Sequence, residues 1–101
     1  MELTYGRYLK VEELLQLQQP LSEGPEHDEM LFIIIHQVYE LWFKQILHEL
    51  EKLKSSFQEG ERGKALHTLK RIRSILKVLV SQVDVLETMT PLEFLSFRER
   101  L

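Results

Sequence analysis

The sequence has no cysteine among its 101 residues. Disulfide bridges, thiolate metal sites and a cysteine nucleophile are therefore excluded, and the absence is compatible with a reducing compartment. We take the cytoplasm as the expected location. Long apolar runs are also missing, because the longest, Met30–Ile35, is far shorter than the roughly 20 residues that a membrane helix needs. Met1 and Glu2 do not open a signal peptide, so no membrane or secretory segment is expected.

Positive charge is scarce relative to what nucleic-acid binding requires. Thirteen basic residues against sixteen acidic ones give a formal net charge of −3, and the basic residues are spread along the chain. A phosphate backbone is therefore not an expected partner. What is present is 44% hydrophobic and 29% charged residues, which is typical of one folded domain, or of part of one, rather than of a disordered tail.

Strand-like alternation is absent, and helical spacing runs through the whole chain. We predict an all-α fold in which two long helices form an antiparallel hairpin flanked by two short helices, as part of a larger helical bundle. Gly60 and Gly63 supply the reversal between the long helices, and Thr90, Pro91 and Glu93 form a capping-box sequence. The expected elements are a helix at about 4–16, a connector at 17–27, long helices at about 28–58 and 62–89, and a short helix from 91.

The two long helices carry more apolar surface than one hairpin buries. Helix 62–89 has a seam at alternating steps of four and three, predicted to face helix 28–58: Ala65, Leu69, Ile72, Leu76, Leu79, Val83 and Leu86. Helix 28–58 has a second apolar stripe in its first half: Leu31, Ile34, Val38, Leu41 and Trp42. One partner helix cannot cover both faces, so we expect further chain or another subunit to cover the rest.

His36 lies in the middle of an apolar helical stripe. Steps of three and four from Phe32 reach the other members of that stripe: His36, Tyr39, Phe43, Ile46, Leu50, Leu53 and Phe57. Such an imidazole must find a hydrogen bond, because an unpaired buried polar group costs about 1–3 kcal/mol. The residues alone leave two interpretations open: a structural histidine satisfied by a nearby carbonyl or by Glu40, and a histidine that faces a ligand.

Metal-site spacings are not met elsewhere. His48 and Glu49 begin a sequence like the zinc-protease helix, but Lys52 stands where the second histidine is needed. No glutamate lies three residues before any of the four histidines, which argues against a carboxylate-bridged di-iron site. We interpret His27 as a helix-start residue and His67, like His48, as solvent-exposed.

Seven motifs follow one another in a distinctive order: Leu3–Leu9, Pro20–Ser22, His27–Gln37, Glu40–Trp42, His48–Leu50, Leu86–Pro91, and Phe94 with Phe97–Arg98. In this order and spacing they resemble the tryptophan 2,3-dioxygenase family. The resemblance covers essentially the whole chain and corresponds to the amino-terminal third or so of the family. It implies all-helical, homotetrameric enzymes that contain haem b. These enzymes add both atoms of dioxygen across the indole C2–C3 bond of L-tryptophan and give N-formylkynurenine, in the kynurenine pathway of tryptophan catabolism.

The resemblance also assigns roles within the active site. His36 corresponds to the catalytic histidine on the distal side of the haem, which accepts a hydrogen bond from the indole N–H. Phe32 would pack on the indole ring, Arg98 would clamp the substrate carboxylate, and Leu101 would line the same pocket. Three positions of the first helix match family residues that reach into the substrate site of a neighbouring subunit: Tyr5, Tyr8 and Leu9.

Two positions depart from the family, and one ligand is not matched. Val83 stands where members have an aromatic residue near the haem, and Phe94 replaces the tyrosine of some members. The iron-ligating histidine and a glycine- and serine-rich loop fall after Leu101, so no metal ligand is assigned within this chain. We expect the 101-residue chain alone to bind little or no haem and to turn over no tryptophan. The rival hypothesis is a non-enzymatic, oligomeric helical interaction module.

Overall fold

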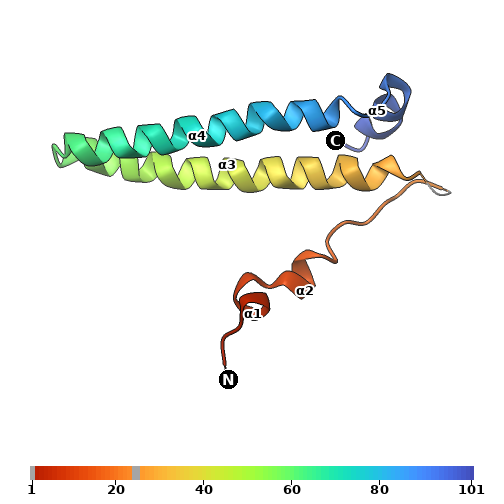
Figure 1. Cartoon of the computed structure of the whole chain (residues 1–101), viewed down its shortest axis with the longest axis horizontal. Coiled ribbons are helices and arrows are strands. Elements are labelled where there is room, and N and C mark those ends of the chain that lie inside the picture. Colours follow the sequence, from red (N-terminus) through yellow and green to blue (C-terminus); the bar gives the residue numbers. More distant parts are fainter. Residues whose placement is uncertain (1, 24–25) are drawn as a thin grey trace.

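The computed structural model describes residues 2–23 and 26–101. Over these ranges the chain forms helices and no strands: α1 (Tyr5–Leu9), α2 (Val11–Leu14), α3 (Asp28–Gln58), α4 (Arg62–Leu86) and α5 (Pro91–Arg98). α3 and α4 lie side by side as an antiparallel hairpin, and α5 folds back beside the start of α3 (Figure 1). The predicted all-α hairpin is confirmed. Gly24 and Pro25, part of the predicted connector, lie outside the described residues.

The hairpin seam differs from the one predicted for α4. Leu69, Leu76 and Val83 were expected to face α3, but they are exposed. Their inward places are taken by residues one position earlier in each turn: Thr68, Ile75 and Gln82. Thr68 can be buried at little cost because its hydroxyl donates to the carbonyl oxygen of Lys64 at 3.0 Å. Three of the seven predicted seam residues are therefore left on the outer face of α4, whereas Ala65 is buried and Ile72, Leu79 and Leu86 are half-buried.

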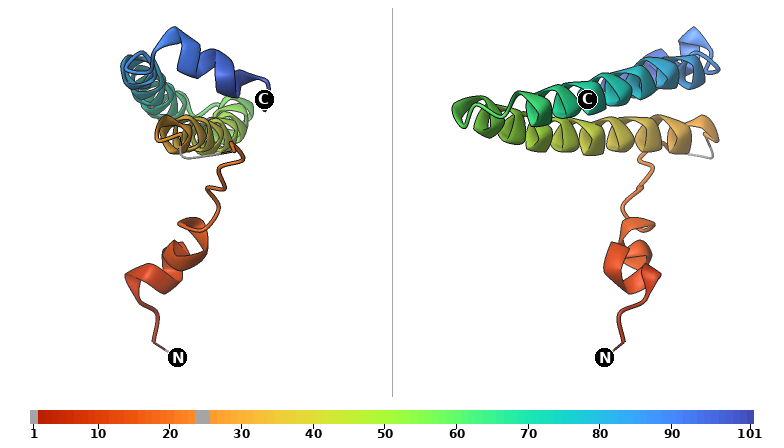
Figure 2. Two further views of the ribbon diagram at one scale, coloured as in Figure 1. Left: turned by 90° about the vertical axis from the view of Figure 1, so that its right-hand side faces the viewer. Right: turned by 60° about the vertical axis from the view of Figure 1, so that its left-hand side comes forward.

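The amino-terminal segment is not the single helix predicted at about 4–16. Lys10 takes a left-handed conformation, with φ 54° and ψ 44°, and separates α1 from α2. Neither helix buries a residue, so no tertiary packing holds the segment straight, and intrinsic propensity alone does not sustain so short a helix. This arm, residues 2–19, projects away from the hairpin (Figure 2). The amide of Gln37 holds it, accepting from Gln18 at 2.9 Å and donating to the Leu17 carbonyl at 3.0 Å.

α5 closes one end of the hairpin. It starts with the predicted capping box, in which the Thr90 hydroxyl accepts from the Glu93 N–H and the Glu93 carboxylate accepts from the Thr90 N–H. α4 ends at Leu86, three residues before the predicted boundary, and the turn that follows buries Met89. A small apolar core joins α3 to α5: Phe32, Met89 and Phe97, with Leu31, Leu86 and Phe94 packed against it.

The described chain is elongated rather than compact. Its radius of gyration is 18.0 Å, whereas a compact domain of this length has about 13 Å. Its accessible surface is 8374 Å², against about 6,000 Å² for a compact monomer of this mass. Much of the excess is apolar side chain on the outer faces of α3 and α4. Within the described residues, no helix combines the length and apolarity needed to cross a membrane.

Candidate functional site

The ring of His36 is held in one tautomer by its own helix. Nδ1 lies 2.7 Å from the carbonyl oxygen of Phe32, one turn earlier. A carbonyl oxygen only accepts, so Nδ1 carries the hydrogen and donates it. In the neutral ring, Nε2 is then an acceptor. The ring centroids of Phe32 and His36 are 4.4 Å apart, which further restricts the rotation of the imidazole. The structural interpretation of His36 therefore accounts for Nδ1. Among the described residues no hydrogen bond to Nε2 is found, so this nitrogen is open to a ligand.

Two hollows flank the His36 ring. The smaller, of about 200 Å³, is lined by Gln19, Leu21, Glu29, Phe32, Ile33, His36, Gln37, Arg100 and Leu101. The larger, of about 540 Å³, is lined by Leu14, Leu17, His36, Gln37, Glu40, Leu41, Lys44 and Leu101. His36, Gln37 and Leu101 belong to both walls, so the imidazole lies where the two hollows meet. A mostly apolar hollow with a few fixed polar groups is typical of a small-molecule site.

A buried carboxylate stands beside the smaller hollow. Glu29 is 1% exposed, and its two oxygens accept from the backbone N–H groups of Leu21, at 3.1 Å, and Ser22, at 3.0 Å. The Arg100 Nε lies 3.3 Å from one of these oxygens. Burial raises the pKa of Glu29, but the Leu21 and Ser22 N–H groups, together with the charge of Arg100, outweigh it. The net pKa is lowered, so the carboxylate is ionised at neutral pH.

Each nitrogen of the Arg100 guanidinium has a partner beside Glu29. Besides Glu29, it donates from Nη1 to the Ser96 carbonyl at 2.9 Å and from Nη2 to the Ser22 hydroxyl at 3.2 Å. It also stands over the Phe97 ring, 5.9 Å from the centroid. Arg100 is therefore a structural neighbour of the hollow rather than a free anion-binding group.

The structure brings three of the predicted site residues together. His36, Phe32 and Leu101 line one hollow. Phe32 is only 2% exposed, because its ring packs against those of Phe94, at 5.9 Å, and Phe97, at 5.5 Å. Only a small part of the ring is therefore open to the hollow.

Arg98 is placed near these residues but does not line either hollow. It is the last residue of α5, and its carbonyl accepts from the Leu101 N–H at 3.1 Å, one turn from the hollow's wall. Its side chain is exposed and, within residues 2–23 and 26–101, makes no side-chain hydrogen bond or ion pair. The guanidinium is thus available to a ligand.

Tyr5, Tyr8 and Leu9 are not brought to His36 of the same chain. All three lie on α1 and are exposed, Tyr5 at 79% and Tyr8 at 70%. The arm that carries them points away from the hairpin in each view (Figure 2). Their large apolar surfaces are therefore open to a second molecule.

The remaining residues singled out by the sequence lie outside the site. Val83 is exposed on α4, and His27 and His48 are exposed at the start and in the middle of α3. Phe94 is half-buried against Phe32. In the part of the chain that the structure describes, no three histidine, cysteine, aspartate or glutamate residues are grouped to hold a metal ion.

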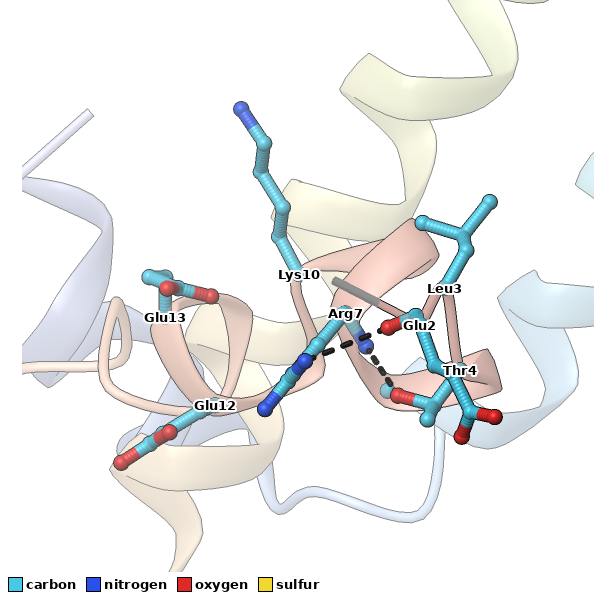
Figure 3. A pocket seen from close by; sticks show the side chains of 8 residues that line it. Glu2, Leu3, Thr4, Arg7, Lys10, Glu12 and Glu13 are labelled. Carbon is cyan, nitrogen blue, oxygen red and sulfur yellow. Dashed lines mark hydrogen bonds between the residues drawn. The ribbon is translucent and has the colours of Figure 1, made fainter.

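A further hollow lies on the arm and is unrelated to this site. It measures about 680 Å³ and is formed by residues close in the sequence, from Glu2 to Glu13 (Figure 3). Arg7 crosses it, donating from Nη1 to the Glu2 carbonyl at 3.2 Å. The lining side chains are exposed, so no fixed polar group points into an excluded space. We assign no ligand to it.

Sequence reasoning missed Glu29 and Arg100. Glu29 lies within the motif His27–Gln37, but the sequence analysis gives it no role of its own. The signal was its spacing, since Glu29 precedes Phe32 by three residues and His36 by seven, which puts a carboxylate on the apolar face. Arg100 had no such signal, because it lies past the end of α5, where helical spacing predicts nothing.

Comparisons with known proteins point to one family. The sequence profile of the tryptophan 2,3-dioxygenase family matches residues 1–101. A tryptophan 2,3-dioxygenase of Herpetosiphon aurantiacus is 62% identical over 99 residues, covering 98% of this chain and 38% of the relative. One of Anaeromyxobacter sp. (strain K) is 63% identical over 99 residues, covering 98% and 37%. One of Aedes aegypti is 49% identical over 107 residues, covering 98% and 27%. The chain therefore spans 27–38% of the length of these three relatives.

Proposed function

The chain belongs to the tryptophan 2,3-dioxygenase family, and from that premise we propose that it forms the substrate-facing part of a haem enzyme that oxidises L-tryptophan. The reaction adds both atoms of dioxygen across the C2–C3 bond of the indole, which breaks, and yields N-formylkynurenine. The enzyme would act in cytoplasmic tryptophan catabolism. The observation that carries the proposal is His36, whose Nε2 is left as an acceptor on a mostly apolar wall.

The indole ring and this wall are chemically complementary. An indole nitrogen carries one hydrogen and only donates, so a buried indole needs one acceptor within apolar surroundings. His36 supplies that acceptor, because its Nδ1 is already bonded to the Phe32 carbonyl. Phe32 and Leu101 supply apolar contact on either side of it. His36, together with Phe32 and Leu101, therefore orients the indole without needing a charged residue.

The carboxylate of the amino-acid substrate needs a cation at the far end of the site. Arg98 is exposed one turn before Leu101, and a planar guanidinium holds a carboxylate through two parallel hydrogen bonds. Arg100 is the weaker candidate, because its charge is already paired with Glu29 and its Nη atoms donate to Ser96 and Ser22. We therefore assign the substrate carboxylate to Arg98.

The residues present fit one wall of a haem pocket. A single histidine among apolar side chains, with one nitrogen fixed to the backbone, suits a neighbour of the cofactor rather than a set of metal ligands. Haem, when bound, supplies the iron chemistry that activates dioxygen. We propose that its protein ligand comes from the part of the family's length that this chain does not span. His36 and Leu101 then keep the substrate oriented and exclude water from the indole.

The amino-terminal arm is proposed to complete a neighbouring subunit's site. Tyr5, Tyr8 and Leu9 are exposed and lie on a helix that buries nothing within its own chain. An isolated helix of that length is unstable in water, so its order must come from a partner. A second copy of the enzyme, within a homotetramer, is the partner we propose.

The proposal is tested on the full-length enzyme, by which we mean the haem-loaded protein in which residues 1–101 are followed by the rest of the family's length. Incubation with L-tryptophan and dioxygen should give a product that has gained two oxygen atoms, measured by mass spectrometry. The purified 101-residue chain should give none and should show no tryptophan-dependent change in a haem absorption band. Absence of product from the full-length enzyme would favour the rival, a non-enzymatic helical interaction module.

A further inference from the structure

Three segments that are distant in the sequence meet at one buried carboxylate. Glu29 stands in the first turn of α3 and is 1% exposed. Its two oxygens accept from the N–H groups of Leu21 and Ser22, in the connector that follows the arm. One of the oxygens lies 3.3 Å from Nε of Arg100, a residue that follows α5. The connector, α3 and the residues after α5 are therefore tied together through the Glu29 side chain.

The same residues form the wall beside His36. Leu21, Glu29, Arg100 and Leu101 line the hollow of about 200 Å³ that also contains the imidazole. Leu101 directly follows Arg100 in the chain, so contacts that hold Arg100 also restrict where Leu101 lies. The carboxylate is thus part of the wall and contacts other residues that line the hollow.

We propose that Glu29 is a positioning residue that holds the wall of the substrate site in place. It acts through Leu21 on one side and through Arg100 and Leu101 on the other, and it need not touch the substrate. The inference rests on the proposed function, since it takes the hollow beside His36 to be the site of the indole. Glu29 also links the arm to the site, because its partner Leu21 follows the last residue of the arm, Gln19, by only two positions.

The chemistry of this corner requires a carboxylate. Both oxygens of Glu29 accept N–H groups, and a cation lies beside one of them. A glutamine would present its NH₂ group to one of these N–H donors, so it can replace only half of the contacts. Aspartate is shorter by one methylene, so it cannot reach Leu21, Ser22 and Arg100 from the same backbone position.

The protein contains a matched control for a purely structural role. Glu49 is also buried in α3, at 4% exposed; Gln45 Nε2 donates to it at 2.7 Å, and Arg71 Nη1 forms an ion pair with it at 3.5 Å. It is not among the residues that line the two hollows beside His36. Replacing Glu49 by glutamine thus removes a buried charge with an arginine partner away from the site.

The experiment compares Glu29→Gln and Glu49→Gln in the full-length enzyme. A displaced wall weakens the binding of the substrate and of the transition state by the same amount. The loss raises KM and leaves kcat unchanged. We expect Glu29→Gln to raise the KM and the dissociation constant for L-tryptophan about tenfold, with kcat within about twofold. Glu49→Gln is expected to lower the melting temperature about as much as Glu29→Gln does. It should leave KM and the dissociation constant for L-tryptophan unchanged. Equal KM values in the two variants would overturn the proposal.

A second variant keeps the proposal falsifiable if Glu29→Gln does not fold. Arg100→Gln removes one of the three partners and leaves the two backbone hydrogen bonds to Glu29. It should raise KM about threefold with kcat unchanged, and a KM equal to that of the unmodified enzyme would refute the role of Glu29. Failure of the proposed function gives a different result, because the unmodified enzyme would then not oxidise tryptophan at all.

Discussion

The imidazole of His36 donates to the backbone carbonyl of Phe32 across 2.7 Å, and this bond within one helix determines which ring nitrogen faces the hollow. A histidine held in this way presents one acceptor of fixed direction. If that acceptor holds the indole N–H, its contribution should depend on the substrate having a hydrogen at that nitrogen.

Replacing His36 by alanine in the full-length enzyme should lower kcat/KM for L-tryptophan by about 3- to 10-fold, the value of one hydrogen bond. With a substrate methylated at the indole nitrogen, the same replacement should change kcat/KM much less, because that substrate cannot donate. His48→Ala, at an exposed position of α3, is the control and should leave both values unchanged. An equal loss with both substrates would contradict the hydrogen bond and indicate a structural role.

Arg98→Lys should weaken substrate binding because an ammonium cannot make the paired hydrogen bonds of a guanidinium. We expect KM for L-tryptophan to rise about tenfold, with a smaller change in kcat. Arg62→Lys, at the exposed start of α4, provides a matched control. If Arg98→Lys and Arg62→Lys have the same KM, the assignment of the carboxylate to Arg98 is wrong.

The role of the arm can be tested by mixing two impaired subunits. A variant with Tyr5 and Tyr8 replaced by alanine keeps its own His36, and a His36→Ala variant keeps its own arm. If each arm completes a neighbouring site, co-assembly at equal amounts should restore about a quarter of the sites, since half of the random pairs are mixed and each contains one intact site. Activity no higher than the average of the two variants alone would show that arms serve their own subunits.

The parts of the fold that could be predicted are those in which helical spacing or a local motif determines the structure. The long helices, their hairpin and the capping box at Thr90 follow from local patterns, and the structure contains all of them. The face of α4 that meets α3 did not follow, because Thr68 and Leu69 are adjacent and hydrophobicity favours the leucine. Burial of Thr68 depends on its hydroxyl bond to Lys64, which a hydrophobic pattern does not represent.

The site was predictable to the extent that it lies on α3. Phe32 and His36 share a helix face, so their proximity followed from the spacing. Leu101 and the corner at Glu29 depend on how α5 and the connector fold back, and these contacts span up to 78 residues. The sequence pattern has no information on such contacts, and the resemblance to the family supplied Leu101 but not Glu29.

The Glu29 corner should also make stability depend on pH. Its pKa in the folded protein is lowered from the usual 4.5. The stabilisation is therefore fully present above about pH 4.5 and is lost as the pH falls through the folded pKa. Melting temperatures of the full-length enzyme and of Glu29→Gln should differ most at neutral pH and converge as the pH falls below 4.5 and through the lowered pKa of Glu29. A difference that stays constant on acidification would show that the charge of Glu29 contributes nothing to folding.

Gly60, between α3 and α4, and Gly63, in the first turn of α4, should respond in opposite directions to the same substitution. Gly60 has φ +72°, and a Cβ at either Gly60 or Gly63 would meet nothing within 4 Å, so backbone conformation alone separates them. Gly60→Ala should destabilise the full-length enzyme by about 1–2 kcal/mol, the cost of a left-handed conformation in a residue with a Cβ. Gly63→Ala lies in the first turn of α4 and should stabilise by about 0.5–1 kcal/mol. Denaturation midpoints in urea measure both, and shifts of the same sign would mean that the turn at Gly60 relaxes to a conformation that any residue adopts.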